Sequence, residues 1–264
     1  MNISFYTARS SMIAQQQGLN VYANNIANIN TIGYKALRPS FAECIYTLQN
    51  PPREQWQTGH GQYTHKTDLM WEQGGLVFTD QPLDYAIPGE GFFMTLDRNG
   101  DTYLTRDGRF GITNTGERWE LVNGFGDFVL DYDGERIVVP FEVHHYRINE
   151  NGTRVRVMNA EEADESVQTD YIDYSALYNM IGVFNVPNNW GLDQSGDNRF
   201  VVTARSGNPI ADRAADKVEM AIENSTTDLA GEMVRLIETQ RSYQFSAKLV
   251  QVSDEIMKTV NNLR

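Results

Sequence analysis

The chain has 264 residues, 41% hydrophobic and 22% charged, which is enough apolar material for one large domain or two to three small ones. Its 22 basic and 35 acidic residues give a net charge of −13, so its overall field does not favour nucleic acid or anionic membrane. The single cysteine, Cys44, excludes an internal disulfide and a cysteine-based zinc site. With no apolar stretch of ~18 residues and no secretory signal pattern in residues 1–10, composition alone favours an intracellular protein without direct membrane insertion.

The first segment has the spacing of a helix that packs against another helix. Its seam positions alternate in steps of three and four, and they are Phe5, Ala8, Met12, Gln15, Leu19, Tyr22, Ile26 and Ile29. We expect Ser4 to cap this helix and residues 28–33 to end it. Residues 10–34 carry no charge, whereas an exposed helix normally has charges on its water-facing side. Both faces of this helix are therefore expected to lie against protein.

The other end of the chain repeats this spacing. The positions are Leu229, Met233, Leu236, Gln240, Tyr243, Ala247, Val250, Asp254 and Met257. Ser225 followed by Asp228 resembles a capping box just before the apolar run. At ~1.5 Å per residue the two helices would be on the order of 40 and 50 Å long, which favours packing between subunits. A plain antiparallel helix pair within one compact domain is the alternative.

Between the helices, turn-forming pairs recur at roughly ten-residue spacing, separated by short Val, Ile, Phe and Tyr runs. These pairs are Asn99-Gly100, Asp107-Gly108, Thr115-Gly116, Asn123-Gly124, Asp133-Gly134 and Asn151-Gly152. The pattern predicts a mostly antiparallel β domain at 76–200, with irregular connectors at 36–75 and 200–221. The predicted fold class is therefore α+β, with a helix in 1–35 that pairs as a coiled coil with 222–264. The segment 157–198 lacks Lys and Arg and is expected to be a solvated acidic surface.

Two loop patterns resemble ligand sites but do not fit them. Residues 97–101 begin like a calcium loop, but Gly100 is at the fourth position and Gly108 stands where a bidentate Glu is required, so a hairpin turn is expected. Residues 89–94 have two glycines of a dinucleotide loop, but Met94 replaces the third and no helix follows.

The remaining candidate chemistry is equally weak. His60 with His65 and the adjacent His144 and His145 could meet at a metal only through a coincidence of tertiary structure. No pair of carboxylates is singled out for glycoside cleavage, and no serine lies in a nucleophile elbow. The Asn151 sequon matters only in a eukaryotic secretory context. We therefore predict no enzyme activity, no catalytic residue, no cofactor and no metal.

Three longer motifs stand in a fixed order along the chain. The N-terminal motif is Ala23-Asn24-Asn25-Ile26-Ala27-Asn28, followed by Asn30-Thr31 and Gly33-Tyr34-Lys35. The middle block includes Gln73-Gly74-Gly75-Leu76, Pro82-Leu83-Asp84, Gly89-Glu90-Gly91-Phe92-Phe93 and Tyr103-Leu104-Thr105-Arg106-Asp107-Gly108. The C-terminal motif includes Asp228-Leu229-Ala230, Glu232-Met233, Gln240-Arg241-Ser242-Tyr243 and Asp254-Glu255-Ile256-Met257. Together and in this order, the three motifs resemble those of bacterial flagellar axial proteins, which form the rod and hook. Where rod proteins commonly have Ser-Asn-Val-Asp, this chain has Ser225-Thr226-Thr227-Asp228, which keeps the capping chemistry.

The resemblance implies a structural subunit of the basal-body rod, since hook proteins are usually longer in the middle. In this family the terminal helices pair into the inner layer of a hollow tube that transmits torque, with β domains outside. The implied partners are copies of itself, other rod and hook proteins, and the flagellar type III export apparatus. Export of this type needs no cleavable signal, so the resemblance reverses the intracellular expectation. Proximal and distal rod positions both stay open.

The residues expected to pack between subunits are the helix seam positions and three amides of the N-terminal motif. They are Phe5, Met12, Leu19, Tyr22, Asn24, Asn25, Ile26, Asn28, Leu229, Met233, Leu236, Gln240, Tyr243, Val250 and Met257. The amides are expected to hydrogen-bond between helices, because burying them unpaired is costly. Two alternatives stand beside this interpretation: an extracellular carbohydrate-binding or carbohydrate-acting β protein with a helical stalk, and a cytosolic coiled-coil adaptor.

Overall fold

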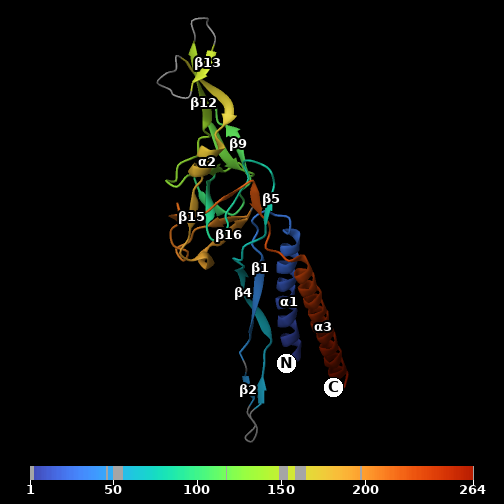
Figure 1. Ribbon diagram of the computed structural model, residues 1–264. Coiled ribbons are helices and arrows are strands. Elements are labelled where there is room, and N and C mark those ends of the chain that lie inside the picture. The colour runs from blue at the N-terminus through green and yellow to red at the C-terminus, as the bar shows by residue number, and fades with distance from the viewer. Residues whose placement is uncertain are drawn as a thin grey trace. The chain divides into compact units, whose positions relative to one another are not determined.

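The computed structural model describes residues 3–45, 47–49, 56–116, 118–148, 154–157, 165–196 and 198–263, which form two compact units (Figure 1). We call Met1–Gly75 with Asn224–Arg264 the helical unit and Leu76–Glu223 the β unit. The fold is α+β, with an N-terminal helix, a C-terminal helix in contact with it, and antiparallel sheets. This confirms the α+β class and the antiparallel β region predicted from the sequence, whereas pairing of the two helices as a coiled coil stays a prediction.

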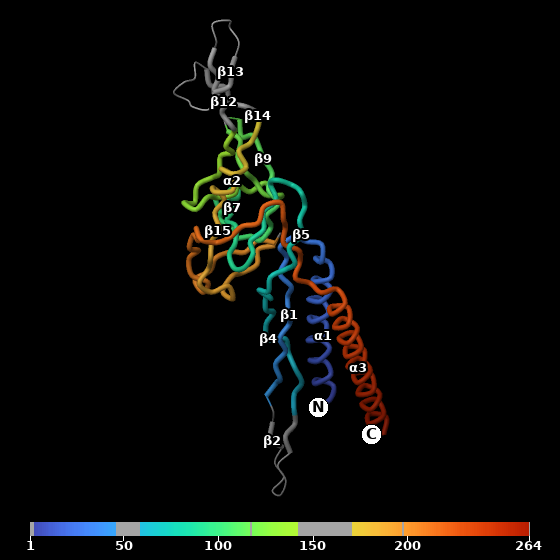
Figure 2. The backbone as a smooth tube through the Cα atoms, viewed as in Figure 1, coloured from blue at the N-terminus to red at the C-terminus, as the bar shows by residue number. Residues whose placement is uncertain are grey.

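The helical unit consists of two long helices and a strand hairpin. Its elements are α1 (Ile3–Ala27), β1 (Leu37–Glu43), β2 (Thr47–Gln49), β3 (Trp56–Thr58), β4 (Gln62–Leu69) and α3 (Leu229–Asn262). The strands pair antiparallel, β1 with β4 and β2 with β3. In Figures 1 and 2, α1 lies between α3 and the β1–β4 hairpin, and the start of α1 lies at the same end of the unit as the end of α3.

The ends of the two helices follow the local sequence. Asp228 is the N-cap of α3, and its side chain accepts hydrogen bonds from the backbone N–H groups of Ala230 and Gly231. The helix α1 ends at Ala27, before Gly33 takes a positive φ of 65°. The expectation for Ser4 was wrong, since this residue lies inside α1 and its hydroxyl contacts Ser253 on α3.

Both segments that were expected as irregular connectors contain strands. Residues 36–75 hold the hairpin, in which Leu37 pairs with Leu69 and Glu43 with Gln62. Pro39 fits within β1 because a two-stranded hairpin leaves one edge of each strand unpaired. In the second segment, 200–221, the chain forms short strands that belong to the β unit.

The β unit is built around a nine-stranded antiparallel sheet. Seven of its strands follow the order β16-β17-β8-β7-β11-β10-β9, and β15 joins β7 to β18. The bounds are β7 (Phe92–Leu96), β8 (Thr102–Thr105), β9 (Phe110–Asn114), β10 (Trp119–Asn123), β11 (Phe128–Val129), β15 (Val183–Asn185), β16 (Asp193–Gly196), β17 (Arg199–Val201) and β18 (Ile210–Ala211). The 3-10 helix η2 (Asn189–Gly191) precedes β16.

Smaller antiparallel ladders complete this unit. They are β5 (Leu76–Phe78) with β20 (Ala221–Glu223), β6 (Tyr85–Ala86) with β19 (Val218–Glu219), and the three-stranded sheet of β12 (Phe141–Ile148), β13 (Arg154–Val157) and β14 (Glu165–Ile172). The short helix α2 (Tyr174–Met180) follows β14 and begins at the N-cap Asp173.

The core of the β unit gathers strand residues around α2. Its buried members are Tyr85, Ile87, Phe93, Phe110, Leu121, Val129, Ile137, Leu177, Ile181 and Val183. Gly108 is required beside this core, because a Cβ there would overlap the backbone carbonyl of Tyr85, which lies in β6. The Asp107-Gly108 pair predicted as a turn is thus a close approach between two segments.

Two of the other predicted loops lie at the two ends of β7. Asn99-Gly100 joins β7 to β8, with Gly100 at a positive φ of 91°, so residues 97–101 form the expected hairpin turn. Gly89 and Gly91 also have positive φ, and β7 follows them instead of a helix, which confirms that this is not a dinucleotide loop. The Asn151-Gly152 turn, the sequon at Asn151 and part of the acidic segment lie outside the described residues.

One buried cation fastens the chain before β19 to the end of α2. Lys217 Nζ donates to the carbonyl oxygens of Tyr178 at 2.6 Å and Ile181 at 2.7 Å, where α2 leaves acceptors without helical partners. The ammonium also lies 4.6 Å from the ring centroid of Tyr178 and 5.2 Å from that of Tyr132. Burial nevertheless lowers the pKa of Lys217 from 10.5 to about 8, because it penalises the charged form.

This lowered pKa predicts how stability changes with pH. Between about pH 8 and 10 the folded chain has released the Lys217 proton while the unfolded chain still holds it, so stability rises with pH. We expect the urea midpoint of the β unit in the full chain to increase over this interval. Lys217→Met should abolish the increase, and an equal increase in this variant would show that another group causes it.

Candidate assembly interface

The contact between α1 and α3 is made by small and polar side chains that recur every seven residues. Ser4, Ser11, Gly18 and Asn25 on α1 lie opposite Ser253, Ser246, Thr239 and Glu232 on α3, respectively. We call these four pairs the seam; the residue numbers in every pair add up to 257. The hydroxyl oxygens of the first two pairs are 3.2 and 3.1 Å apart. Contacts of this size bring two helix backbones close together.

Gly18 is the point where three elements meet. A Cβ added to this residue would lie 3.5 Å from Thr239 Cγ2 on α3 and 3.1 Å from Phe41 Cζ on β1. Gly18 is buried in the described structure. A side chain larger than a methyl group at this position would therefore force α3 or the hairpin away from α1.

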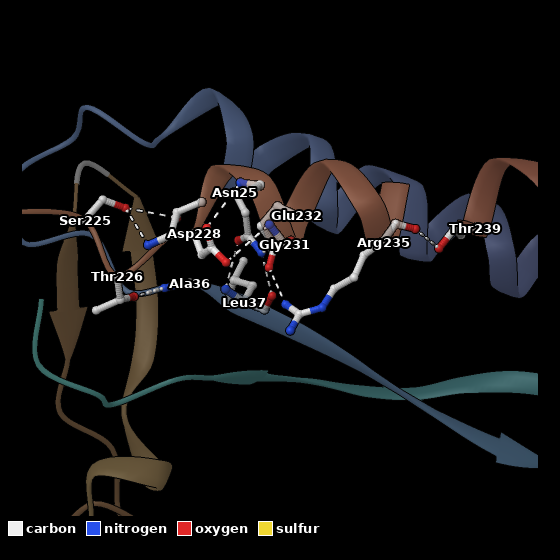
Figure 3. A network of polar contacts seen from close by, with 12 residues as sticks. Asn25, Ala36, Leu37, Ser225, Thr226, Asp228, Gly231, Glu232, Arg235 and Thr239 are labelled. Atoms are coloured by element: carbon white, nitrogen blue, oxygen red, sulfur yellow. Dashed lines mark hydrogen bonds and ion pairs between the residues drawn. The ribbon is translucent and has the colours of Figure 1, made fainter. Parts of the chain in front are cut away.

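Asn25 makes the last contact of the seam, and its side-chain amide donates two hydrogen bonds and accepts two (Figure 3). The residue is fully buried, and its Nδ2 donates to the Leu37 carbonyl oxygen at 2.7 Å and to Glu232 Oε2 at 3.2 Å. Its Oδ1 accepts from the Leu37 backbone N–H at 2.9 Å and from the Tyr34 hydroxyl at 3.2 Å. The amide therefore pairs with the backbone of Leu37 as a neighbouring strand would, and one residue joins α1, β1 and α3.

Glu232 is a buried carboxylate that two partners hold. Besides the Asn25 amide on one oxygen, Arg235 Nη1 lies 2.6 Å from the other oxygen, Oε1. Burial of an ionised carboxylate is strongly unfavourable unless hydrogen bonds and an opposite charge compensate it. The geometry around Glu232 supplies both.

The segment before α3 is anchored in the same region (Figure 3). Thr226 Oγ1 accepts from the Ala36 backbone N–H at 2.9 Å, and the Thr226 N–H donates to the Tyr34 carbonyl oxygen at 3.1 Å. Burial, reinforced by the nearby Glu232 charge, raises the pKa of Tyr34 to about 12. The Tyr34 hydroxyl therefore keeps its proton at neutral pH and remains a donor to Asn25.

The β1–β4 hairpin covers another face of α1. Ser10 Oγ donates to the His60 carbonyl oxygen at 3.3 Å, and a Cβ at Gly61 would overlap Ser10 Oγ. Together with Phe41 beside Gly18, these contacts lay the hairpin along the helix. Two faces of the nearly uncharged α1 are thus covered within the chain, by α3 and by the hairpin, whereas Tyr6, Ile13 and Asn20 stay exposed. Arg9 is the one charged residue in α1.

On α3 the structure places the predicted packing residues beside the seam. Leu236, Tyr243 and Val250 are half-buried, whereas Leu229, Met233, Gln240 and Met257 are exposed. The buried seam residues occupy the positions one residue before Met233, Gln240, Ala247 and Asp254. The sequence pattern that could have found them is the same seven-residue spacing, applied to Ser, Thr and Gly instead of to apolar residues.

On α1 the predicted packing residues differ in their burial. Phe5, Met12, Leu19, Tyr22 and Ile26 are half-buried, Asn25 is buried, Asn28 is half-buried and Asn24 is exposed. Asn28 Nδ2 donates to the Asn24 carbonyl oxygen at 2.9 Å, and Asn24 Nδ2 donates to the Tyr34 hydroxyl at 3.4 Å. Of the three amides, Asn25 is the one that reaches α3 in the described contacts.

Large apolar side chains of α3 point away from the seam into solvent. These exposed residues are Leu229, Met233, Val234, Ile237, Phe245, Leu249, Val252, Ile256, Met257, Val260 and Leu263. From Phe245 onward, one group of them recurs in steps of three and four, which places Phe245, Leu249, Val252, Ile256 and Val260 on one face of the helix. We call this group the outer stripe. Phe245 is 66% exposed, and large exposed apolar side chains that gather on one face often mark a surface that binds another protein.

A metal site and a membrane span each require specific features of the described residues. Within them, no group of three or more His, Cys, Asp or Glu side chains is arranged to hold a metal ion. The side chains of His144 and His145 lie outside the described ones. None of the helices in the described ranges combines the length and hydropathy that a membrane span requires.

These features define a class: an α+β protein whose two chain ends form one helical unit with an exposed apolar stripe. Comparison with known families gives the identity of that class. Residues 5–35 match the family described as Flagella basal body rod protein, residues 86–155 the Flagellar hook protein FlgE/F/G D1 domain, and residues 219–263 the Flagellar basal body rod FlgEFG protein C-terminal.

Full-length relatives agree with these matches. The chain is 32% identical to the flagellar basal-body rod protein FlgG of Borreliella burgdorferi, over 99% of this chain and 98% of the relative. It is 30% identical to the protein of the same name from Bacillus subtilis, over 99% and 98%, and 26% identical to the flagellar hook-basal body complex protein FlhP of that organism, over 99% of both. The chain therefore belongs to the flagellar basal-body rod protein family.

The Asn25 contacts predict the effect of removing its amide. Asn25→Leu leaves the Leu37 backbone groups and Glu232 without their partner, so we expect a loss of about 3–5 kcal/mol in the stability of the helical unit. Urea unfolding of the full chain, followed by far-UV circular dichroism, measures this loss. Asn20→Leu, on the exposed face of α1, is the matched control and should change stability by less than about 0.5 kcal/mol. Equal losses in the two variants would contradict the assigned role of Asn25.

Proposed function

We propose that this chain is a structural subunit of the flagellar basal-body rod and that the outer stripe of α3 packs against neighbouring subunits. The observation that carries the proposal is the separation of surfaces on α3, where small residues face α1 and large apolar residues face solvent. Exposure of this much apolar surface is unfavourable in a monomer and becomes favourable when a second surface covers it.

The distribution of charge supports a layered assembly. Residues 1–75 and 224–264 together hold 10 basic and 9 acidic residues, whereas residues 76–223 hold 12 basic and 26 acidic ones. A nearly neutral helical unit suits the dense interior of a tube, because buried like charges would repel one another. The strongly acidic β unit suits the solvated exterior. We therefore propose that 1–35 with 222–264 form the inner layer, that 76–200 form the outer domain, and that 36–75 and 200–221 connect them.

We further propose that α1 and α3 pair as an antiparallel coiled coil. Support comes from the seven-residue repeat of the seam and from the half-buried Leu236, Tyr243 and Val250 beside it. The predicted packing residues that stay exposed on α3 are then available to neighbouring subunits. Heterologous contacts of this kind do not close on themselves and generate a helical shaft that transmits motor torque.

The proposed partners are other copies, other rod and hook proteins, and the type III export apparatus, which would carry the chain out of the cytoplasm without a cleavable signal. The role is structural and non-enzymatic. A carbohydrate-binding or carbohydrate-acting protein with a helical stalk gains no support, because the relatives described above are named as flagellar rod or hook–basal body proteins.

The outer stripe gives the test. Phe245→Asp with Val252→Asp places two carboxylates on the stripe, and we expect loss of rod assembly and motility in a strain that depends on this chain. Recovery of the chain in purified hook–basal bodies and swimming distance in soft agar are the measurements. Helix content of the purified variant should stay unchanged, because both side chains are solvent-exposed.

The matched control adds the same charge to the same helix. Gln244→Asp with Gln251→Asp has the same spacing, and both glutamines are exposed outside the outer stripe. This control should assemble and support swimming. Normal assembly of the Phe245 and Val252 variant would overturn the proposed packing surface, and absence of the parent chain from basal bodies would overturn the rod assignment.

A further inference from the structure

The seam between α1 and α3 is nearly the same in every heptad. Ser4, Ser11 and Gly18 face Ser253, Ser246 and Thr239 in the structure. A shift of α3 by seven residues would place Ser11 opposite Ser253 and Gly18 opposite Ser246. These two new pairs are as small as the old ones and keep a hydroxyl at the contact, while Ser4 at the open end of the pair would face Val260. Ser11 and Gly18 therefore hold the helices close without choosing between registers.

The Asn25 pair differs from the rest of the seam. In the shifted arrangement Asn25 would face Thr239, and the buried Glu232 carboxylate would lose the amide that donates to it at 3.2 Å. Figure 3 shows this carboxylate between the Asn25 amide and Arg235. Because a buried carboxylate needs its hydrogen bonds, this pair distinguishes the observed register from the shifted one.

A second anchor lies next to the Asn25 pair, before the first turn of α3. Thr226 contacts the chain that follows α1 through three bonds. Its Oγ1 accepts from the Ala36 N–H at 2.9 Å and donates to the Tyr34 carbonyl oxygen at 3.5 Å, and its own N–H donates to the same oxygen at 3.1 Å. The Thr226 side chain therefore opposes any sliding of α3 along α1, and it does so at the same end of the helix pair.

We propose that Asn25, Glu232 and Thr226 set the register of the α1–α3 pair, while the serine and glycine positions of the seam only allow the helices to approach. A shift by one heptad would move α3 by about 10 Å and change which part of its outer stripe lies beside a given residue of α1. The inference concerns the fold of the helical unit and does not rest on the proposed function.

Cysteine crosslinking on the purified full chain tests this proposal. In a Cys44→Ser background, Ser4→Cys with Ser253→Cys reports the observed register, and Ser11→Cys with Ser253→Cys reports a one-heptad shift. In the parent chain the shifted crosslink should form at no more than about a tenth of the yield of the first, because the shifted register leaves Glu232 without the amide. Peptide mapping after mild oxidation identifies each disulfide.

The decisive variant removes the side-chain contacts of Thr226 and Glu232 and keeps the backbone bond from the Thr226 N–H to the Tyr34 carbonyl oxygen. Thr226→Ala with Glu232→Ala leaves the bonds from Asn25 to Leu37 and Tyr34 in place, and we expect the two crosslink yields to come within about threefold of each other. Thr239→Ala with Ser246→Ala is the matched control, since it changes two seam residues of the same helix. This control should keep the parent ratio.

The outcomes separate cleanly. A parent-like ratio in the Thr226 and Glu232 variant overturns the proposal, and so does an equal loss of specificity in the control. Far-UV circular dichroism verifies that the helices persist. If the double variant loses its helical signal, the single variant Glu232→Ala is measured in the same way, and an unchanged crosslink ratio in that folded chain also overturns the proposal.

Discussion

The close approach of α1 and α3 is the constraint on which the rest of the helical unit depends. With Gly18 and serine hydroxyls at the contact, side chains the size of leucine cannot enter the seam, so the large apolar residues of α3 lie outside it. A neutral hydrogen bond contributes about 1 kcal/mol net, so the hydroxyl pairs alone hold the helices weakly. The buried Asn25 and Glu232 therefore carry the specific part of the contact.

The β1–β4 hairpin stabilises α1 in addition to the seam. Residues of α1 include Gly18 and several asparagines, which have low helix propensity, and a helix of this composition needs neighbours to persist in water. The β1–β4 hairpin provides one of those neighbours, with Phe41 against Gly18 and the His60 carbonyl against Ser10. Asn25 then ties the first residue of β1 to α1, so hairpin, helix and seam stabilise one another.

The sequence predicted the two helices and the antiparallel β region, because alternating spacing, the Asp228 cap and Asn-Gly turns are local signals. On α3 it included the half-buried Leu236, Tyr243 and Val250, but it chose Met233 and Gln240 instead of the buried residues that precede them. Apolar spacing shows which side chains avoid water and not which partner covers them. The sequence did not predict the hairpin, because Pro39 and Gly61 normally indicate irregular chain. Pro39 fits in β1 because one edge of this strand is unpaired, and Gly61 is needed because Ser10 lies against it. The role of Asn25 depends on Leu37 and Glu232, and the position of Glu232 beside it could be known only from the folded chain.

The seam and the outer stripe of α3 use different interactions. Hydrogen bonds between polar groups are directional, so a seam that ends at Asn25 and Glu232 fixes geometry within one chain before any neighbour arrives. Hydrophobic burial is non-directional, and it contributes about 25 cal/mol for each Å² covered when subunits meet. Because the seam is already satisfied within the chain, the proposed association relies on the exposed residues of α3, the outer stripe among them. In the proposed assembly, charge repulsion between the acidic β units opposes random contacts between free subunits, so ordered packing of the helical units is the favourable way to cover the stripe.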